Sequence, residues 1–237
     1  MEIIPLKTTH IIEANERLTD ILDETFIANN VRLQEKDVLV ITEKVAAQTQ
    51  GRVVHTSEIK EISEQAKDLA LKFGLDPPLV QMILNESSHV FGGVQGMLLT
   101  VNSGILIANA GIDHSNAGLG DNYVLWPSNP YDLAANVVRY IKEKYSLKEF
   151  GVSISDSRVQ PLKRGVVGVS IGVAGFYPIE DCRRRVDLYG YKMRFKVRAL
   201  ADQITDAAIA LMGECDEQTP FALIHAGSLV SCWVECS

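Results

Sequence analysis

The stretch Ile105-Leu-Ile-Ala-Asn-Ala-Gly-Ile-Asp-His-Ser-Asn116 begins as a short apolar strand and ends in a polar loop. Gly111 frees the backbone where the strand stops. Asp113, Ser115 and Asn116 then bring oxygens and an amide together within four residues. Polar side chains that follow a buried strand are a frequent place for a binding or catalytic site. The stretch therefore predicts a site at the end of a β-strand.

A second stretch, Gly151-Val-Ser-Ile-Ser-Asp-Ser157, repeats this design. A short apolar strand ends there in a carboxylate, Asp156, with the hydroxyl of Ser157 beside it. Two such carboxylates can share one hard divalent cation, which prefers carboxylate, hydroxyl and water oxygens. The alternative is that Asp113 and Asp156 each cap a turn, as aspartate often does. The residues alone leave both interpretations open.

Length and composition narrow the class of protein. The chain has 237 residues, 46% of them hydrophobic and 22% charged, which is enough for a real core in one or two domains. Its formal net charge of −7 argues against nucleic acid or an anionic membrane as a partner. The first residues do not form a signal peptide, and the longest apolar stretch, 166–176, is about half the ~20 residues that a membrane span needs. We therefore expect a soluble cytoplasmic protein.

The side chains that bind transition metals are scattered. The four cysteines contain no CxxC pair, and reduced thiols are expected in a cytoplasmic protein. Cys232 and Cys236 lie four residues apart, which is weak support for a metal site. The five histidines show no ligand spacing, so each is predicted to be structural.

The hydrophobic pattern predicts a mixture of helices and strands. Strands are expected at 2–6, 37–42, 97–101, 104–108, 151–157, 165–176, 191–199 and 221–225. Helices are expected at 16–29, at 62–73, from 77 onward, at 130–145 and at 202–212. The glycine-spaced run 165–176 is predicted to be a central strand, and 43–52 a polar segment. Because the order lacks a regular βαβ rhythm, the expected fold class is mixed α/β (α+β).

One loop is a candidate for binding phosphate. The standard phosphate-binding loops are absent. Lys163 and Arg164 precede a glycine, and guanidinium pairs bidentately with phosphate. They follow Asp156 closely, so cation, carboxylate and arginine could converge. An ordinary solvated loop is the alternative, and spacing does not choose between them. We predict a catalytic role for Lys163 or Arg164, adding positive charge to a phosphoryl-transfer transition state.

Two further patterns favour structural interpretations. Gly168-Val-Ser-Ile-Gly172 matches the letters of a nucleophile elbow, but it lies in a continuous β-like run, where the required sharp turn is not expected. Lys and Arg alternate with apolar residues from Lys192 to Arg198. We interpret this cationic stripe as the solvated face of a strand, with attraction of a polyanionic substrate as the alternative.

Five short motifs occur along the chain in order. They are Asn109-Ala-Gly-Ile-Asp-His-Ser-Asn116, Ser155-Asp156-Ser157, Arg164-Gly-Val-Val-Gly168, Asp187-Leu-Tyr-Gly190, and Ala201-Asp202 running to Leu211-Met-Gly-Glu214. Together they resemble the coenzyme F420-0:L-glutamate ligase (gamma-glutamyl ligase) family. The resemblance spans nearly the whole chain, from Glu2 to about His225.

The resemblance implies an activity, a fold and an assembly. Enzymes of this family add L-glutamate through a γ-glutamyl amide bond, with GTP as co-substrate and Mn²⁺ or Mg²⁺ as the metal. Their fold is an unusual mixed-sheet α/β fold, and they form intertwined dimers. We therefore expect a homodimer in which residues 1–237 form a single ligase-like unit, built as one body or as two intertwined subdomains with no clear linker.

The resemblance also implies roles for individual residues. Asp113 and Asp156 match metal ligands, and Ser157 stands where the family has a hydroxyl residue, usually Thr, that serves the same metals. Asn116 matches a nucleotide contact. Met212, Gly213 and Glu214 match the start of a segment that contacts the nucleotide in the family. Glu214 is also predicted to be a metal ligand.

Two positions depart from the family pattern. The family has a nucleotide-contacting Lys in a segment like S-K-A-E-G-R, where this chain has Gln48, which keeps a donor and loses the charge. After Glu214 the family is rich in glycine, whereas this chain reads Cys215-Asp-Glu-Gln218, and carboxylates there repel phosphate unless another metal intervenes. Gln48 remains a predicted nucleotide contact, and metal binding is better supported than GTP binding.

Three functions follow from these observations. The preferred one is a metal- and GTP-dependent γ-glutamyl ligase acting on F420-0, with a folate-like acceptor as the runner-up. The second is a non-catalytic homologue that binds an F420-like or nucleotide ligand. The third is an unrelated metal-dependent phosphoryl transfer or hydrolysis.

Overall fold

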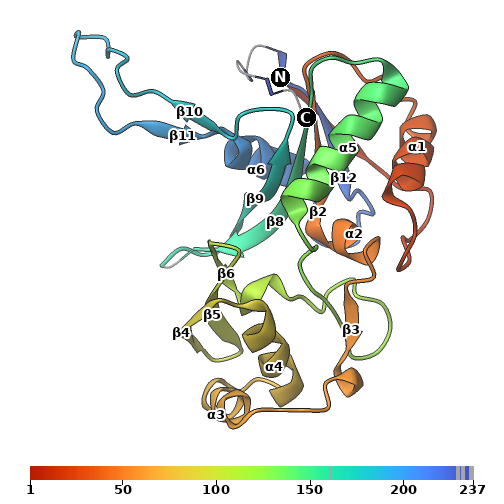
Figure 1. Ribbon diagram of the computed structural model, residues 1–237, viewed down its shortest axis with the longest axis vertical. Helices are drawn as coiled ribbons and strands as arrows, with labels where there is room; N and C mark the ends of the chain where they lie inside the picture. The colour runs from red at the N-terminus through yellow and green to blue at the C-terminus, as the bar shows by residue number, and fades with distance from the viewer. Residues whose placement is uncertain (161, 228–229, 231–232, 235–237) are drawn as a thin grey trace.

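A five-stranded mixed sheet forms the centre of the molecule (Figure 1). The computed structural model describes residues 1–160, 162–227, 230, 233 and 234. The strands lie in the order β1 (Glu2–Leu6), β12 (Phe221–His225), β2 (Asp37–Thr42), β8 (Phe150–Val159) and β9 (Val166–Ala174). The pair β2–β8 is parallel, and the other three pairs are antiparallel. The predicted mixed α/β class is confirmed.

Helices cover both faces of this sheet (Figure 1). On one face, α1 (Leu18–Ala28) and α5 (Pro130–Tyr145) share a core with Leu39 and Ile41 of β2. On the other face, α6 (Leu200–Met212) shares a core with Val38 and Val40. Successive residues of a strand point to opposite faces, so a strand buried on both sides is apolar throughout. The uninterrupted apolar run of β2 follows from this position.

The edge strand β9 corrects one prediction. The glycine-spaced run was expected in the centre of the sheet, but β9 pairs only with β8 among the described strands. A Cβ at Gly168 would lie 2.6 Å from the Cα of Asp206 in α6, and one at Gly172 would lie 2.5 Å from the backbone of Pro130 in α5. Because helices press on both of its faces, this edge strand has the sequence of a central one.

Strand β8 corrects a second prediction. It was expected to end at Asp156, but it continues to Val159. Residues 155–159 pair antiparallel with β9 after a bulge between Ile154 and Ser155. Asp156 therefore lies within a strand and not at its end, and the loop that carries Lys163 and Arg164 is confined to the connection between Val159 and Val166. Pro161 of that loop lies outside the described residues.

A smaller layer of helix and sheet lies below the main sheet in Figure 1. The strands β4 (His89–Val94), β5 (Met97–Asn102) and β6 (Ile105–Ala108) form a meander, which confirms the predicted β5–β6 hairpin. The helices α3 (Glu64–Phe73) and α4 (Pro77–Glu86) complete its core. A short antiparallel ribbon is formed by β3 (Val53–His55) and β7 (Asn122–Val124). The number of independent domains stays a prediction.

A hairpin arm formed by residues 177–199 projects from the body (Figure 1). Only β10 (Ile179–Asp181) and β11 (Val197–Ala199) are strands in it, with one bridge between Val186 and Lys192. The strand predicted at 191–199 is therefore wrong in extent. The alternation is present in the sequence, but Phe195 is 89% exposed, so no sheet packs against its apolar side in the described chain.

The remaining elements are short or close to expectation. The helix α2 (Glu43–Gln48) replaces the predicted polar segment, and two single-turn helices, η1 (Thr56–Glu58) and η2 (Asn109–Gly111), were not predicted. The helices α1, α3, α5 and α6 begin and end within two residues of the predicted positions. No helix in the described ranges combines the length and apolar character that crossing a membrane requires.

Candidate active site

Three carboxylates lie close together where the parallel pairing of β2 with β8 ends. Thr42 at the end of β2 pairs with Ser155 of β8, which places Glu43, the first residue of α2, near Asp156. Asp113 approaches from the loop after η2, where its backbone bridges to Val124. After burial, the charges of Asp156 and Asp113 raise the pKa of Glu43, and the charge of Asp113 raises the pKa of Asp156. Ligand sites of open α/β sheets lie beyond the carboxyl ends of parallel strands. The two stretches singled out in the sequence therefore converge.

The carboxyl group of Asp156 is buried and firmly oriented. The indole N–H of Trp126 donates to its Oδ2 at 2.7 Å, and the backbone N–H of Ser157 donates to its Oδ1 at 2.6 Å. Burial nevertheless raises the pKa of Asp156 to about 6. Burial, followed by the neighbouring charge of Asp156, also raises the pKa of Glu43 well above its usual value. The carboxylates of Asp156 and Glu43 therefore lack enough positive charge around them to balance their own.

Asp113 and Lys44 form the more open side of the site. The Lys44 Nζ lies 2.7 Å from Asp113 Oδ2 and donates to Ser115 Oγ at 2.8 Å. Partial burial on its own would raise the pKa of Asp113. The hydrogen bonds from Lys44 and Ser115 outweigh it and lower that pKa. This carboxylate is therefore ionised and paired.

The other predicted ligands connect three segments around these carboxylates. Ser157 Oγ donates to Glu214 Oε1 at 2.5 Å, which joins β8 to the segment after α6. Gln48 Nε2 donates to the carbonyl oxygen of Asn116 at 3.3 Å, and Asn116 Nδ2 donates to the carbonyl of Cys215 at 3.1 Å. The structure thus brings Gln48, Asn116, Ser157 and Glu214 to the same region.

The predicted nucleotide contacts at the end of α6, Met212 and Gly213, offer mainly backbone groups to the site. The Met212 side chain is buried in the core that α6 shares with β2, so only its backbone is left to contact a ligand. Gly213 has a φ of +82° and ends the helix. A Cβ there would lie 2.2 Å from the carboxyl carbon of Glu217, whose Oε2 accepts the N–H of Cys215 at 2.8 Å. A carboxylate of the chain itself therefore occupies this turn.

Lys163 and Arg164 lie at the tip of the β8–β9 hairpin. Val159, the last residue of β8, is three residues beyond Asp156, which places the tip about 10 Å or more along the strand. No side-chain contact joins either residue to the carboxylates within the described part of the chain. Their catalytic role stays a prediction, which the turnover of an Arg164→Gln variant would test.

Two lesser patterns also have defined positions. Ser170 lies within β9, where its hydroxyl shares a hydrogen bond of 2.7 Å with that of Ser153, so the nucleophile-elbow turn is absent there, as expected. Cys182 and Cys215 are free thiols, whereas Cys232 and Cys236 lie outside the described residues.

The donor set fits a hard divalent cation of the Mg²⁺ or Mn²⁺ type. No three His, Cys, Asp or Glu side chains in the described ranges meet closely enough to hold a metal by themselves. Such ions are commonly held by one or two carboxylates, with water and substrate phosphates completing the shell. Asp113 and Asp156 supply the carboxylates, and the buried Thr42 hydroxyl has no hydrogen-bond partner among the described residues. One lysine faces three carboxylates, which favours a further cation.

Three residues of this site were not predicted from the sequence. Glu43 and Lys44 directly follow a buried strand, which is the signal that singled out Asp113, but they were included in a polar segment. Trp126 had no signal in its own neighbourhood. The related feature of the sequence is Gly111. A Cβ at this position would lie 2.0 Å from the indole Nε1 of Trp126. The glycine of the opening stretch therefore also makes room for the tryptophan that holds Asp156.

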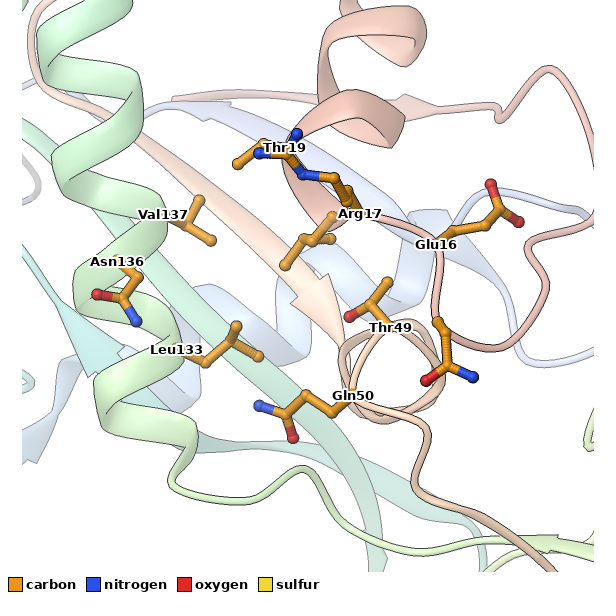
Figure 2. A pocket seen from close by; sticks show the side chains of 10 residues that line it. Glu16, Arg17, Thr19, Thr49, Gln50, Leu133, Asn136 and Val137 are labelled. Carbon is orange, nitrogen blue, oxygen red and sulfur yellow. The ribbon is translucent and has the colours of Figure 1, made fainter.

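A separate open cavity of about 340 Å³ lies between the start of α1, the end of α2 and α5 (Figure 2). Thr49 and Gln50, at the end of α2, border it, as do Leu133 and Val137 of α5. Its lining includes Glu16 and Arg17 but no group of carboxylates. Neither Lys44 nor Gln48 lines this cavity.

Comparison with known proteins identifies relatives of the whole chain. The sequence model of the family described as F420-0:Gamma-glutamyl ligase matches residues 7–226. A protein of Methanopyrus kandleri named coenzyme F420:L-glutamate ligase is 38% identical over 217 residues, which is 91% of this chain and 84% of the relative. Proteins of the same name from Methanococcus maripaludis and Methanothermobacter thermautotrophicus are each 34% identical, over 95% and 81% of this chain and 88% and 76% of the relatives. The resemblance seen in the five motifs is thereby confirmed, and the chain belongs to the F420-0:gamma-glutamyl ligase family.

Proposed function

We propose that this protein is a γ-glutamyl ligase that joins L-glutamate, through its amine, to a carboxylate of coenzyme F420-0, with consumption of GTP and the help of Mn²⁺ or Mg²⁺. Family membership and the names of the relatives support the reaction class. The observation in this chain that carries the proposal is the cluster of Glu43, Asp113 and Asp156 beyond the parallel strands. A ligase that uses a nucleotide needs such a place, because phosphoryl transfer depends on positive charge held by carboxylates.

The reaction places defined demands on these residues. A carboxylate oxygen of the acceptor attacks the terminal phosphorus of GTP and GDP leaves. The amine of L-glutamate then attacks the activated acyl carbon, phosphate leaves and the amine loses a proton. A divalent cation held by Asp113 and Asp156 would offset the charge on the transferring phosphoryl group. Trp126 holds Asp156 in one orientation for this task, and Lys44 adds positive charge nearby.

The nucleotide is proposed to lie across the segments that Asn116 joins. Gln48 and Asn116 offer amide groups, while Met212 and Gly213 offer backbone groups at the end of α6. The Glu217 carboxylate, which now accepts the N–H of Cys215, would have to leave this turn before a phosphate could use it. The same features favour a second candidate, a non-catalytic homologue that binds ligand without turnover.

A homodimer forms part of the proposal, and the arm supports it. Leu188, Tyr189 and Phe195 are 99%, 87% and 89% exposed on an arm that stands away from the body (Figure 1). Large apolar side chains gathered on an exposed segment are typical of a protein interface. A second copy of this chain is the proposed partner. Sedimentation should show a dimer at micromolar concentration that Leu188→Asp converts to monomer; a monomeric wild-type protein would contradict it.

A mass-spectrometric assay tests the proposed reaction. The purified protein is incubated with GTP, MnCl₂, L-glutamate and an equimolar mixture of F420-0 and a reduced folate. We expect F420-0 to become heavier by glutamyl residues. If only the folate became heavier by glutamyl residues, the acceptor would be folate-like and not F420-0. Hydrolysis of GTP without either product would favour the unrelated phosphoryl-transfer function. Ligand-induced thermal stabilisation without hydrolysis or product would favour the non-catalytic homologue.

A further inference from the structure

Lys44 is the only basic residue of α2, and it faces the carboxylate cluster. Its ammonium lies 2.7 Å from Asp113 Oδ2 and 2.8 Å from Ser115 Oγ. The side chain is 21% exposed and retains access to solvent along its flexible stem. The ammonium therefore already holds a carboxylate that a divalent cation would use.

Asp113 does not depend on Lys44 for its orientation. Its Oδ1 accepts the backbone N–H of Ser115 at 2.9 Å, and its Oδ2 accepts the Ser115 hydroxyl at 2.6 Å. Its backbone is fixed separately by two hydrogen bonds with Val124. Departure of the ammonium would therefore leave a carboxylate that is still aimed at the same place.

A divalent cation and the Lys44 ammonium cannot both stay on Asp113 without cost. Like charges within a few ångströms repel, and the repulsion is stronger in a partly buried site than in water. The ammonium should therefore weaken cation binding as long as it has no other partner. Nucleotide phosphates would provide one.

The helix α2 places Lys44 next to the predicted nucleotide position. Lys44 and Gln48 are four residues apart, so they lie on one helix face a single turn from each other. Both contact the same loop, Lys44 through Ser115 and Gln48 through Asn116. Because Gln48 carries no charge, Lys44 is the cation on this face that can follow a phosphate.

We propose that Lys44 couples cation binding to nucleotide binding: it holds Asp113 in the cation-free protein and passes to the nucleotide phosphates when the cation takes Asp113. This inference rests on the proposed function. It predicts that the cation binds weakly alone and tightly with nucleotide, and that Lys44 is the positioning residue responsible for much of this difference.

Calorimetric titration of Mn²⁺ into the full-length protein, with and without GDP, tests the proposal. Lys44→Gln removes the charge, and Lys44→Arg keeps it. Lys67→Gln is a matched control, because Lys67 forms an ordinary ion pair of 2.6 Å with Glu64 on the surface helix α3. Thermal unfolding of every variant confirms that the fold is intact.

The expected result is specific to the charge at position 44. Lys44→Gln should bind Mn²⁺ about 5- to 10-fold more tightly in the absence of GDP, and the gain in affinity on adding GDP should shrink by at least the same factor. Lys44→Arg and Lys67→Gln should resemble the wild-type protein. Unchanged or weaker Mn²⁺ binding by Lys44→Gln without GDP would overturn the inference and leave the proposed function standing. Failure of the wild-type protein to bind Mn²⁺ under both conditions would overturn both.

Discussion

Two clusters of charged and polar side chains in this molecule differ in their balance of charge. Asp23, between α1 and α5, accepts hydrogen bonds from Lys144, from the Tyr140 hydroxyl and, at 3.1 Å, from the Tyr145 hydroxyl. Partial burial alone would raise the pKa of Asp23, but these donors outweigh it and lower the pKa. One carboxylate and one ammonium leave this cluster neutral and supplied with donors.

The cluster beyond β2 and β8 has the opposite balance. Three carboxylates share one lysine, and burial raises the pKa of two of them, Glu43 and Asp156. A protein gains no stability from burying unpaired charge, so such an arrangement favours a charged ligand that balances it. The comparison distinguishes Asp23, which stabilises the fold, from the cluster of Glu43, Asp113 and Asp156, which has the charge to bind a cation.

The largest expected effect is on metal binding by Asp156→Asn. Loss of a charged ligand should weaken Mn²⁺ binding in the presence of GTP by at least about 100-fold, since even residues that only support ligands account for 10–100-fold. Titration calorimetry measures this. The control is Asp23→Asn, which removes the same charge from the balanced cluster and should leave the affinity unchanged. Equal affinities in all three proteins would abolish the distinction between the clusters.

The next effect concerns the orientation of Asp156. Trp126→Phe keeps the aromatic volume and removes the N–H that donates to Oδ2 at 2.7 Å. We expect Mn²⁺ affinity to fall by about 10- to 100-fold with little change in fold. Electron paramagnetic resonance of added Mn²⁺ gives the free fraction, and circular dichroism checks the fold. Unaltered affinity would mean that the tryptophan only fills space.

The hydrogen bonds of the Asp23 cluster should contribute to the free energy of unfolding. Asp23→Asn should lower the free energy of unfolding by about 1 kcal/mol at pH 7, after allowance for solvent screening, because charge-assisted hydrogen bonds are lost. Since the folded-state pKa of Asp23 is lowered, this contribution is present above the unfolded pKa of about 3.9 and is lost as pH falls through the folded value. Urea unfolding of both proteins between pH 3 and pH 7 measures the gap. A gap that did not narrow at all as the pH fell from 7 to 3 would be inconsistent with this cause.

The smallest expected effect is on the affinity for GTP. Gln48→Lys would add a second ammonium on the face of α2 that already carries Lys44. GTP binding should tighten by about 3- to 10-fold, because an added cation near phosphate is worth roughly 1 kcal/mol in a partly exposed site. Fluorescence titration with a labelled GTP analogue provides the affinity, and Gln50→Lys, at the neighbouring cavity, serves as the control. If the two variants behave alike, the nucleotide lies elsewhere.

Much of the fold could be predicted from local pattern. The helix α5 has helical spacing with Pro130 in its first turn, and β2 is an unbroken apolar run, so both were predicted correctly. The errors arose where tertiary contact overrode pattern. Helices on both faces give β9 the sequence of a central strand, and residues 191–199 alternate without a sheet beneath them. The helix α2 is too short to show a clear period.

The site was predictable only in part, for a related reason. Asp113 and Asp156 each follow apolar strand residues, which singled them out, and the structure brings them together. Glu43 joins them because β2 and β8 are parallel neighbours, which no local pattern reveals. Trp126 reaches Asp156 from another segment across a space kept open by Gly111. Contacts of this kind depend on the assembled fold.

The most direct test of the central claim is the rate of glutamyl transfer to F420-0 by wild-type, Asp23→Asn and Asp156→Asn proteins, followed by mass spectrometry under identical conditions. The account predicts near wild-type turnover for Asp23→Asn below its unfolding temperature and a loss of at least about 100-fold for Asp156→Asn. Substantial turnover by Asp156→Asn would show that the carboxylates beyond β2 and β8 are not the centre of the reaction.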